Sequence, residues 1–294
     1  LGAICAILRE RSGHDFSGYK ESTLVRRVVR RLQLLQLDSA DEYLRHLGAD
    51  PAEPQGLVQE LLIGVTAFFR DPEAFEALAR QALPSLTQPP GEPVRVWVPG
   101  CASGEEAYSL AILLREHLDK LETPPAVQVF GTDLDAAMVA EARAGRYPAS
   151  IAARVGPERL ERFFHRSGEA WEVHPALREM CVFSQHSLVR DPPFSQIDLL
   201  SCRNVLIYLD GEAQRRLFPL FHYALRPGGI LFLGTAEGVT QGLDLFEVLD
   251  RSARIFRRRE TPRRTEVAFP LAARGPAGAN APAPAPSPSP TSSP

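Results

Sequence analysis

Residues 94–118 read VRVWVPGCASGEEAYSLAILLREHL, and this stretch decides the fold. A short apolar run is followed by a turn with two glycines and then, from Glu105, by a helical pattern. A strand, a glycine-bearing turn and a helix in this order are typical of a parallel sheet that binds its ligand at the carboxyl ends of the strands. Three further apolar runs alternate with helical segments, at 126–132, 197–202 and 230–234. The alternation predicts an α/β fold whose parallel sheet is covered on both faces.

The rest of the chain divides around this sheet. Residues 1–80 have apolar positions at helical spacing, which predicts an N-terminal all-α domain, and 81–93 are expected to form a linker. The sheet domain is expected over 94–259, with a small inserted antiparallel β-subdomain at about 146–183, where short β-type runs interrupt the alternation. Residues 260–294 are rich in Pro, Ala and Ser without periodicity, and are predicted to be disordered.

Composition excludes several classes of protein. The net charge of −3 excludes a globally basic nucleic-acid binder, and no apolar run approaches the roughly 18 residues of a membrane span. The four cysteines are far apart and form no C-x-x-C pair, which favours neither a disulfide scaffold nor a zinc site. We therefore expect a cytoplasmic monomer with no metal site, no nucleic-acid partner and no insertion into a membrane.

The turn after the first predicted strand is the first candidate ligand site. Gly100 and Gly104 let a ligand approach the backbone, but their G-x-x-x-G spacing differs from the G-x-G-x-x-G of dinucleotide sites. Glu105 and Glu106 follow at once, and acids there disfavour a diphosphate and favour a cation such as an amino group. Asp133, at the end of the second predicted strand, is placed to accept hydrogen bonds from ribose hydroxyls. Together these residues suit S-adenosylmethionine, a nucleoside that carries an amino acid; a tight turn and a helix-capping aspartate are the alternative.

Six segments in a fixed order carry a resemblance to a known family. Four of them resemble the chemotaxis receptor methyltransferases of the CheR type: VWVPGCASGEEAYSLA, FGTDLD, DPPFSQIDLLSCRNVLIYL and LRPGGILFLGTAEG. Two further segments resemble that family's N-x-T-x-F-F-R stretch and its basic N-terminal helix: LLIGVTAFFRDPEAF and YKESTLVRRVVRRL. The resemblance covers about residues 1–258. It is closest to members fused to a receptor methylesterase, which would make the chain a piece of a longer protein.

The resemblance implies a class I S-adenosylmethionine-dependent methyltransferase with a Rossmann-like sheet. Such an enzyme forms methyl esters on glutamate side chains of chemoreceptors and releases S-adenosylhomocysteine. By position, Tyr208 and Arg70 would be catalytic, with Tyr208 near the transferred methyl group. The cofactor-binding positions would be Thr66, Arg70, Gly100, Glu105 or Glu106, Asp133, Ser187, Leu188, Arg203 and Asn204.

Two asparagines of the family pattern are replaced here, by Gly64 in the N-x-T segment and by Ser187. Neutral hydrogen bonds are worth about 0.5–1.5 kcal/mol each, so we expect cofactor affinity to be lower by about one to two decades. The hypothesis is an active enzyme with reduced cofactor affinity. A non-catalytic cofactor-binding signalling module is the first alternative.

The segment LVRRVVRRL, residues 24–32, predicts an amphipathic basic helix. At about 100° per residue, Arg26, Arg27, Arg30 and Arg31 fall on one face and the five apolar residues on the other. Like charges at this spacing repel, so the face favours docking of the acidic, glutamate-bearing helices of chemoreceptors. A solvated face, RNA and an anionic membrane are alternatives for the patch. A methyltransferase acting on RNA or a small molecule is the second alternative function.

The expected β-subdomain contains one short turn, Arg166–Glu169. Some family members grip a receptor tail peptide through a longer, glycine-rich turn at this place. We therefore expect no high-affinity receptor tail peptide.

Overall fold

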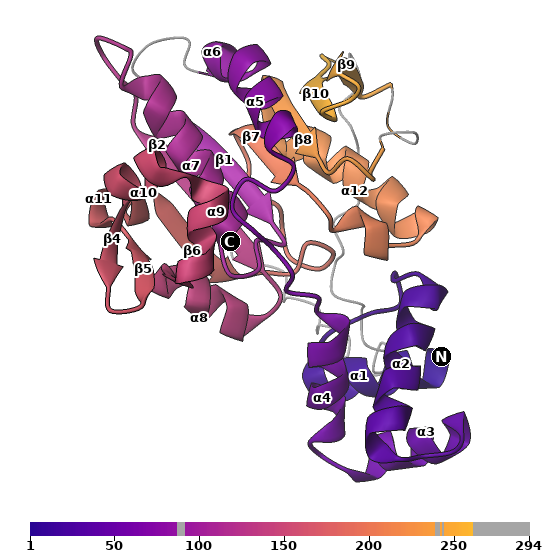
Figure 1. Ribbon diagram of the computed structural model, residues 1–294. Coiled ribbons are helices and arrows are strands. Elements are labelled where there is room, and N and C mark those ends of the chain that lie inside the picture. Colours follow the sequence, from indigo (N-terminus) through magenta and orange to yellow (C-terminus); the bar gives the residue numbers. More distant parts are fainter. Residues whose placement is uncertain (87–91, 239–241, 243, 261–294) are drawn as a thin grey trace, which may run out of the picture.

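The computed structural model describes residues 1–86, 92–238, 242 and 244–260, which form a helical unit and a sheet unit (Figure 1). The helical unit contains α1 (Gly2–Ser12), α2 (Glu21–Leu35), α3 (Ala40–Ala49) and α4 (Glu53–Leu61). Its core includes Leu8, Phe16, Tyr43, Leu47 and Leu57, each 0% exposed. The predicted N-terminal all-α domain is confirmed. The predicted disordered tail lies outside the described residues, apart from Glu260.

A seven-stranded sheet forms the core of the second unit, in the order β6-β2-β1-β7-β8-β10-β9. Its strands are β1 (Val94–Pro99), β2 (Val127–Asp133), β6 (Cys181–Gln185), β7 (Ile197–Cys202), β8 (Leu225–Leu233), β9 (Phe246–Asp250) and β10 (Ile255–Arg258). The first five in the order are parallel to their neighbours, whereas β10 is antiparallel to both β8 and β9. The predicted α/β fold is confirmed, and β9 and β10 form the closing antiparallel hairpin that the runs at 245–249 and 253–257 predict.

Helices cover both faces of this sheet, as predicted. Along β1, Val96 and Val98 face the core shared with α7 (Glu105–Leu118), while Trp97 faces the core shared with α12 (Gly211–Ala224). Alternate side chains point to opposite faces of a strand, so a strand buried on both faces needs an unbroken apolar run. None of the described helices combines the length and the apolar character that crossing a membrane requires.

The boundary between the two units lies earlier than the sequence suggests. Helices α5 (Pro72–Gln81) and α6 (Leu83–Leu86) pack on the sheet, where the rings of Phe75 and Phe232 meet edge to face at 5.6 Å. The expected linker 81–93 therefore contains a helix with two buried leucines, and residues 87–91 lie outside the described part. Helical periodicity predicts a helix but does not say on which core the helix packs.

The inserted subdomain is a three-stranded antiparallel sheet in the order β3-β5-β4, with β3 (Arg146–Pro148), β4 (Phe164–Ser167) and β5 (Ala170–Val173). It lies between α8 (Ala136–Ala144) and β6, with short helices α9 (Ala152–Val155), α10 (Pro157–Phe163) and α11 (Pro175–Arg178). The prediction that the last β-type run before residue 183 belongs to this subdomain is wrong. β6 pairs in parallel with β2 in the main sheet, where Phe183 packs against the bare backbone of Gly131.

Candidate functional site

One pocket lies where the carboxyl ends of β1, β2 and β7 meet the helical unit. The empty space of the pocket and its open mouth together is about 1160 Å³. Most of the predicted site residues line it: Thr66, Arg70, Gly100, Glu106, Asp133, Ser187, Leu188, Arg203, Asn204 and Tyr208. The topology brings them together because parallel strands present their carboxyl ends at one edge of the sheet.

The glycine-bearing turn between β1 and α7 shapes the floor of the pocket. Gly100 has φ 69° and Gly104 has φ 95°, the left-handed region that favours glycine. A Cβ on Gly100 would come within 2.4 Å of Val205 Cγ2, so the turn also needs a residue without a side chain. The backbone can therefore approach a ligand closely here.

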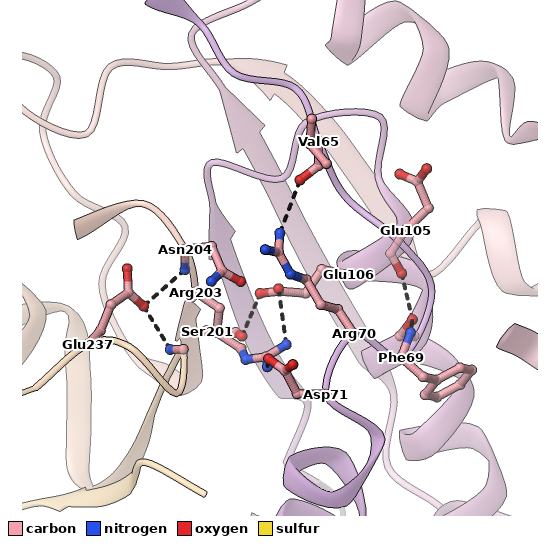
Figure 2. A network of polar contacts seen from close by, with 12 residues as sticks. Val65, Phe69, Arg70, Asp71, Glu105, Glu106, Ser201, Arg203, Asn204 and Glu237 are labelled. Carbon is pink, nitrogen blue, oxygen red and sulfur yellow. Dashed lines mark hydrogen bonds and ion pairs between the residues drawn. The ribbon is translucent and has the colours of Figure 1, made fainter. Parts of the chain in front are cut away.

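Glu106 is a buried acid in the lining of the pocket. Its Oε1 accepts a hydrogen bond of 2.7 Å from the Ser201 hydroxyl, and its Oε2 lies 3.6 Å from Arg203 Nη1 (Figure 2). Burial raises the pKa of this carboxyl, while Arg203 and the Ser201 hydrogen bond oppose the rise. A cationic ligand group beside Glu106 would favour the ionised carboxylate in the same way as Arg203 does.

Arg203 is a buried cation that its protein partners leave incompletely satisfied. Its side chain is 0% exposed and its Nη2 donates to Asp71 Oδ2 at 2.8 Å. The guanidinium carbon lies 5.0 Å from the ring centroid of Phe75 and 4.7 Å from that of Phe232. Within the described residues, Nε and Nη1 are buried without a hydrogen-bond partner. A buried donor left in this state costs about 1–3 kcal/mol, which an acceptor on a ligand would offset.

Glu105 points away from this pair (Figure 2). Its Oε2 accepts a 2.7 Å hydrogen bond from the Ser103 hydroxyl, and among the described residues it is not part of the pocket lining. Its carbonyl oxygen accepts from the Ser109 hydroxyl, which in turn accepts from Phe69 N. The sequence left open whether Glu105 or Glu106 lies in the ligand site. The structure places Glu106 in the pocket lining, whereas Glu105 is bonded to Ser103 of the preceding turn.

Arg70 lies on the segment that leads from α4 to α5. Its Nη1 donates to the Val65 carbonyl at 3.1 Å, and its charge is close enough to lower the pKa of Glu106 (Figure 2). Thr66 lines the pocket from the same segment, as does Gly64. A Cβ on Gly64 would lie 3.0 Å from Met138 Sδ, so the methionine occupies space beside the glycine. Sequence reasoning missed Met138 because a single methionine on an apolar helix carries no site signal.

Asp133 ends β2 with both carboxylate oxygens turned toward backbone donors. Oδ2 accepts from Ala102 N at 2.8 Å and Oδ1 accepts from Asp135 N at 2.9 Å. Burial raises its pKa, and these two backbone hydrogen bonds oppose the rise. Each oxygen keeps a lone pair for a further donor, so the carboxylate can still accept hydrogen bonds from hydroxyl groups.

The wall after β6 is made by a capped turn. Ser187 N donates to Asp191 Oδ2 at 2.7 Å, and Arg190 N donates to the Ser187 hydroxyl at 3.3 Å. Leu188 packs partly against the core of the α12 face and presents an apolar surface to the pocket. The side chain of Ser187 is thus already engaged by its own turn.

Tyr208 comes from a 3-10 turn, Leu206–Tyr208, that a backbone bridge holds to the helical unit. Lys20 N donates to the Tyr208 carbonyl at 2.9 Å, and Asp210 N donates to the Gly18 carbonyl at 2.9 Å. The bridge sets Tyr19 in the pocket lining beside Tyr208. Burial, and then the charge of Asp133 and the nearby Tyr208, raise the pKa of Tyr19 to about 12. Sequence reasoning missed Tyr19, since the motif that contains it was interpreted only as the start of a basic helix.

The basic face of α2 is partly neutralised by α4. Arg31 binds Glu53 through two contacts, Nε to Oε1 at 2.9 Å and Nη2 to Oε2 at 2.5 Å, and Glu53 is 3% exposed. Arg27 and Arg30 both reach Glu60 Oε2, at 3.9 and 3.5 Å. Arg26 is exposed. The four arginines therefore do not form one free patch, and Arg26 and Arg30 are the two that face solvent.

The apolar side of α2 also differs from the prediction. Leu24 and Val28 are buried at 6% exposure each, but Val25 and Val29 are 42% and 43% exposed. The apolar stripe of α2 that is buried is therefore narrower than the predicted face of five apolar residues. The outward face therefore alternates valine with arginine.

Comparison with known proteins matches two families to the chain. The CheR methyltransferase SAM binding domain matches residues 64–255, and the CheR methyltransferase all-alpha domain matches residues 1–62. The chain is 41% identical over 258 residues to an uncharacterized 104.1 kDa protein in the hypE 3' region of Rhodobacter capsulatus, a match that covers 87% of this chain and 27% of that protein. It is 35% identical over 234 residues to chemotaxis protein methyltransferase 2 of Pseudomonas aeruginosa, covering 77% of this chain and 81% of the relative.

Proposed function

Because the chain belongs to the CheR methyltransferase family, we propose that it transfers the methyl group of S-adenosylmethionine to glutamate side chains of chemoreceptors. The observation that carries the proposal is the pairing of buried Glu106 with incompletely bonded Arg203 in the same pocket as Asp133. A cofactor with an ammonium, a carboxylate and ribose hydroxyls has one group for each of these partners.

Three residues of the pocket suit the amino-acid part of the cofactor. Glu106 would accept from the ammonium, since its carboxylate is buried and has one oxygen beyond hydrogen-bond distance of Arg203. Arg70 and Arg203 would hold the carboxylate. A buried charge is stable only when it is paired and hydrogen-bonded, so the unbonded nitrogens of Arg203 support a charged ligand rather than an apolar one.

Two further parts of the lining suit the nucleoside. Asp133 would accept from ribose hydroxyls with the lone pairs that Ala102 and Asp135 leave open. Leu188 and the turn at Ser187 would contact the adenine ring. Ser187 stands where the family has asparagine, and its hydroxyl is bonded to Arg190 N, so affinity lower by about one to two decades remains our prediction. A calorimetric titration that detects no binding at millimolar S-adenosylmethionine would overturn it.

Tyr208 and Arg70 are the catalytic residues of the proposal. When bound, S-adenosylmethionine supplies an electrophilic methyl group on its sulfonium. An acceptor glutamate is already ionised at pH 7, given its reference pKa of about 4.3, so no residue of the chain has to remove a proton. The chain contributes position and exclusion of water: the Tyr208 hydroxyl would orient the acceptor oxygen, and Arg70 would fix the far end of the cofactor.

Substitution Tyr208→Phe tests this role. We expect turnover to fall by about tenfold or more, while S-adenosylhomocysteine affinity changes less than twofold, because the hydroxyl acts on the acceptor and not on the cofactor. Steady-state methylation and calorimetry on one preparation give both numbers. Unchanged turnover with unchanged binding would remove Tyr208 from the mechanism.

The receptor docks, in this proposal, on the outward face of α2. Arg26 and Arg30 supply the positive charge, and the exposed Val25 and Val29 lie beside them on the outward side of α2. Glutamate-bearing helices match such a face in charge. Arg27 and Arg31 support the face from behind through Glu60 and Glu53.

We also propose that no receptor tail peptide binds tightly to the β-subdomain. Strands β4 and β5 are joined by a tight turn at Gly168-Glu169, with Gly168 at φ 63°. Such a turn adds little surface for a peptide beyond the strand edge itself. A titration of receptor tail peptides should give dissociation constants well above micromolar, and a micromolar complex with an aromatic-containing tail would contradict this.

Transfer of a labelled methyl group tests the function as a whole. We expect base-labile label on a chemoreceptor fragment, on glutamate side chains, when the chain is incubated with labelled S-adenosylmethionine. Binding of the cofactor without transfer would favour a non-catalytic signalling module instead. Label on RNA would favour the second alternative, in which the arginines of α2 serve a nucleic acid.

A further inference from the structure

Glu237 is a buried acid that lies outside the pocket lining, on the turn that follows β8. Its residue is 4% exposed, and its carboxylate accepts three backbone N–H groups. Oε2 accepts from Gly234 N at 2.7 Å and from Asn204 N at 2.9 Å, and Oε1 accepts from Leu206 N at 2.7 Å. One carboxylate therefore joins the end of β8 to the loop that follows β7, as Figure 2 shows for Asn204.

The loop that Glu237 holds carries site residues in a costly conformation. Asn204 has φ 61°, a left-handed conformation that costs of the order of 1 kcal/mol in a residue with a side chain. Its N–H and that of Leu206 both donate to the buried Glu237 carboxylate. Without an acceptor there, two buried donors would be left unpaired.

The same loop forms one wall of the cofactor pocket. Asn204, Val205 and Tyr208 line the pocket directly, and Val205 rests on the bare backbone of Gly100. The loop thus connects Glu237 to the glycine turn on one side and to Tyr208 on the other. Movement of the loop would change the shape of the pocket at both places.

Gly234 shows how closely the carboxylate is held. A Cβ on Gly234 would lie 2.8 Å from Glu237 Oε2 and 3.0 Å from Asn204 N. Backbone and side chain meet here with no room for one methyl group. The carboxylate is thus packed closely against the backbone that it bonds, as a positioning role requires.

We propose that Glu237 is a positioning residue for the cofactor pocket, whose carboxylate holds the 203–206 loop so that Asn204 and the following Tyr208 keep their places in the pocket wall. Glu237 acts through the loop, and among the described residues it is not in the lining itself. The inference rests on the proposed function only in taking this pocket as the cofactor site. Binding of S-adenosylhomocysteine to the wild-type chain tests the cofactor site, and the Glu237 variants test the positioning role.

Substitution Glu237→Gln keeps the size of the side chain but replaces one acceptor oxygen by a donor. Whichever way the amide turns, at least one of the three backbone N–H groups then faces an NH₂ group. We expect the dissociation constant of S-adenosylhomocysteine to rise tenfold or more, and the KM for the cofactor to rise with it. Glu247→Gln is the matched control, because Glu247 lies exposed on β9 with its side chain 54% exposed.

A purely structural role would give a different result. In that case Glu237→Gln would lower the melting temperature, yet the folded protein at low temperature would bind S-adenosylhomocysteine as the parent chain does. That outcome would overturn the proposal. If the wild-type chain itself does not bind S-adenosylhomocysteine, this pocket is not the cofactor site, and the proposed function and the role of Glu237 are both overturned. If the wild-type chain binds and Glu237→Gln binds equally well, only the role of Glu237 is overturned.

Gly234→Ala provides a second, milder variant if Glu237→Gln does not fold. Its methyl group displaces the carboxylate without removing the charge. We expect weaker S-adenosylhomocysteine binding that follows the same KM pattern. Unchanged affinity in folded Gly234→Ala would contradict the proposal.

Discussion

Among the described residues, the Arg31–Glu53 pair of the helical unit and the Arg203–Glu106 pair of the pocket each contain a buried glutamate, and the two pairs differ in how completely they are bonded. In the helical unit, Glu53 accepts two hydrogen bonds from Arg31 and a third, of 2.7 Å, from the Tyr43 hydroxyl. In the pocket, Glu106 and Arg203 lie 3.6 Å apart at their nearest atoms, and two nitrogens of Arg203 have no hydrogen-bond partner in the described part of the chain.

The difference separates a structural pair from a ligand site. Glu53 is 3% exposed and both of its oxygens are bonded to side chains of the helical unit, so the pair is closed to a ligand and stabilises the fold. A pair held beyond hydrogen-bond distance leaves donor and acceptor capacity in a buried place, which is costly unless a ligand completes it. The comparison thus predicts opposite effects of the same substitution at Glu53 and at Glu106.

Glu53→Gln should have the largest effect on stability. Removing one charge of a buried pair costs about 3 kcal/mol, because Arg31 then lacks its bidentate partner. Denaturant unfolding measures this as a lower midpoint, and calorimetry on the folded protein should give an unchanged S-adenosylhomocysteine affinity. Loss of binding without loss of stability would reverse the assignment of the two pairs.

Glu106→Gln should do the opposite. We expect binding of S-adenosylhomocysteine to weaken by about tenfold to a hundredfold, since a charged hydrogen bond to the ammonium is worth about 1.5–3 kcal/mol. Stability should fall by less than in Glu53→Gln, because Arg203 already lies beyond hydrogen-bond distance of Glu106 and keeps its hydrogen bond to Asp71, and the amide keeps the Ser201 hydrogen bond. A strongly destabilised variant with intact binding would show that Glu106 serves the fold.

The pH dependence of binding sharpens the same contrast. Burial raises the pKa of Glu106 above its usual 4.5, so the folded chain binds this proton more tightly than the unfolded chain does. The stability contributed by Glu106 therefore falls as the pH rises through the raised pKa, whereas affinity for a cationic ligand group rises over that range. Titrations at several pH values should show affinity falling as the pH drops through the raised pKa of Glu106. In Glu106→Gln this part of the pH dependence should be absent; an equally steep profile there would contradict the role of Glu106.

Charge reversal on the outward face of α2 should have the smallest effect on the chain itself. In Arg26→Glu/Arg30→Glu we expect receptor methylation to fall about tenfold at low salt and less at high salt, with S-adenosylhomocysteine affinity unchanged. Arg216→Glu is the control, since that arginine lies on α12 with its side chain 73% exposed. Salt-independent rates, or an equal loss in the control, would argue against docking on this face.

The fold followed from patterns that depend on neighbours in the sequence. The apolar runs at β1, β2 and β7 and the glycine turn after β1 predict a pocket at the carboxyl edge of the sheet. The same reasoning misplaced α6 and β6, because periodicity does not reveal which core a helix or strand joins.

The site was less accessible to such reasoning where contacts join distant segments. Nothing in the sequence tells Glu105 from Glu106, since the choice depends on Ser201 and Ser103 taking one acid each. The pairing of Arg31 with Glu53 depends on how α2 and α4 pack. Tyr19 reaches the pocket through a bridge to Leu209, a contact between residues 190 positions apart.

Two ligands that differ in the amino-acid part of the cofactor test what Glu106 and Arg203 bind. 5'-Methylthioadenosine shares the nucleoside of S-adenosylhomocysteine but lacks its ammonium and carboxylate. Calorimetry on the wild-type chain should give much tighter binding of S-adenosylhomocysteine, and Glu106→Gln should lose most of that difference while binding 5'-methylthioadenosine unchanged. Equal affinities of the two ligands for the wild-type chain would show that the unsatisfied Glu106–Arg203 pair does not hold the amino-acid part of the cofactor.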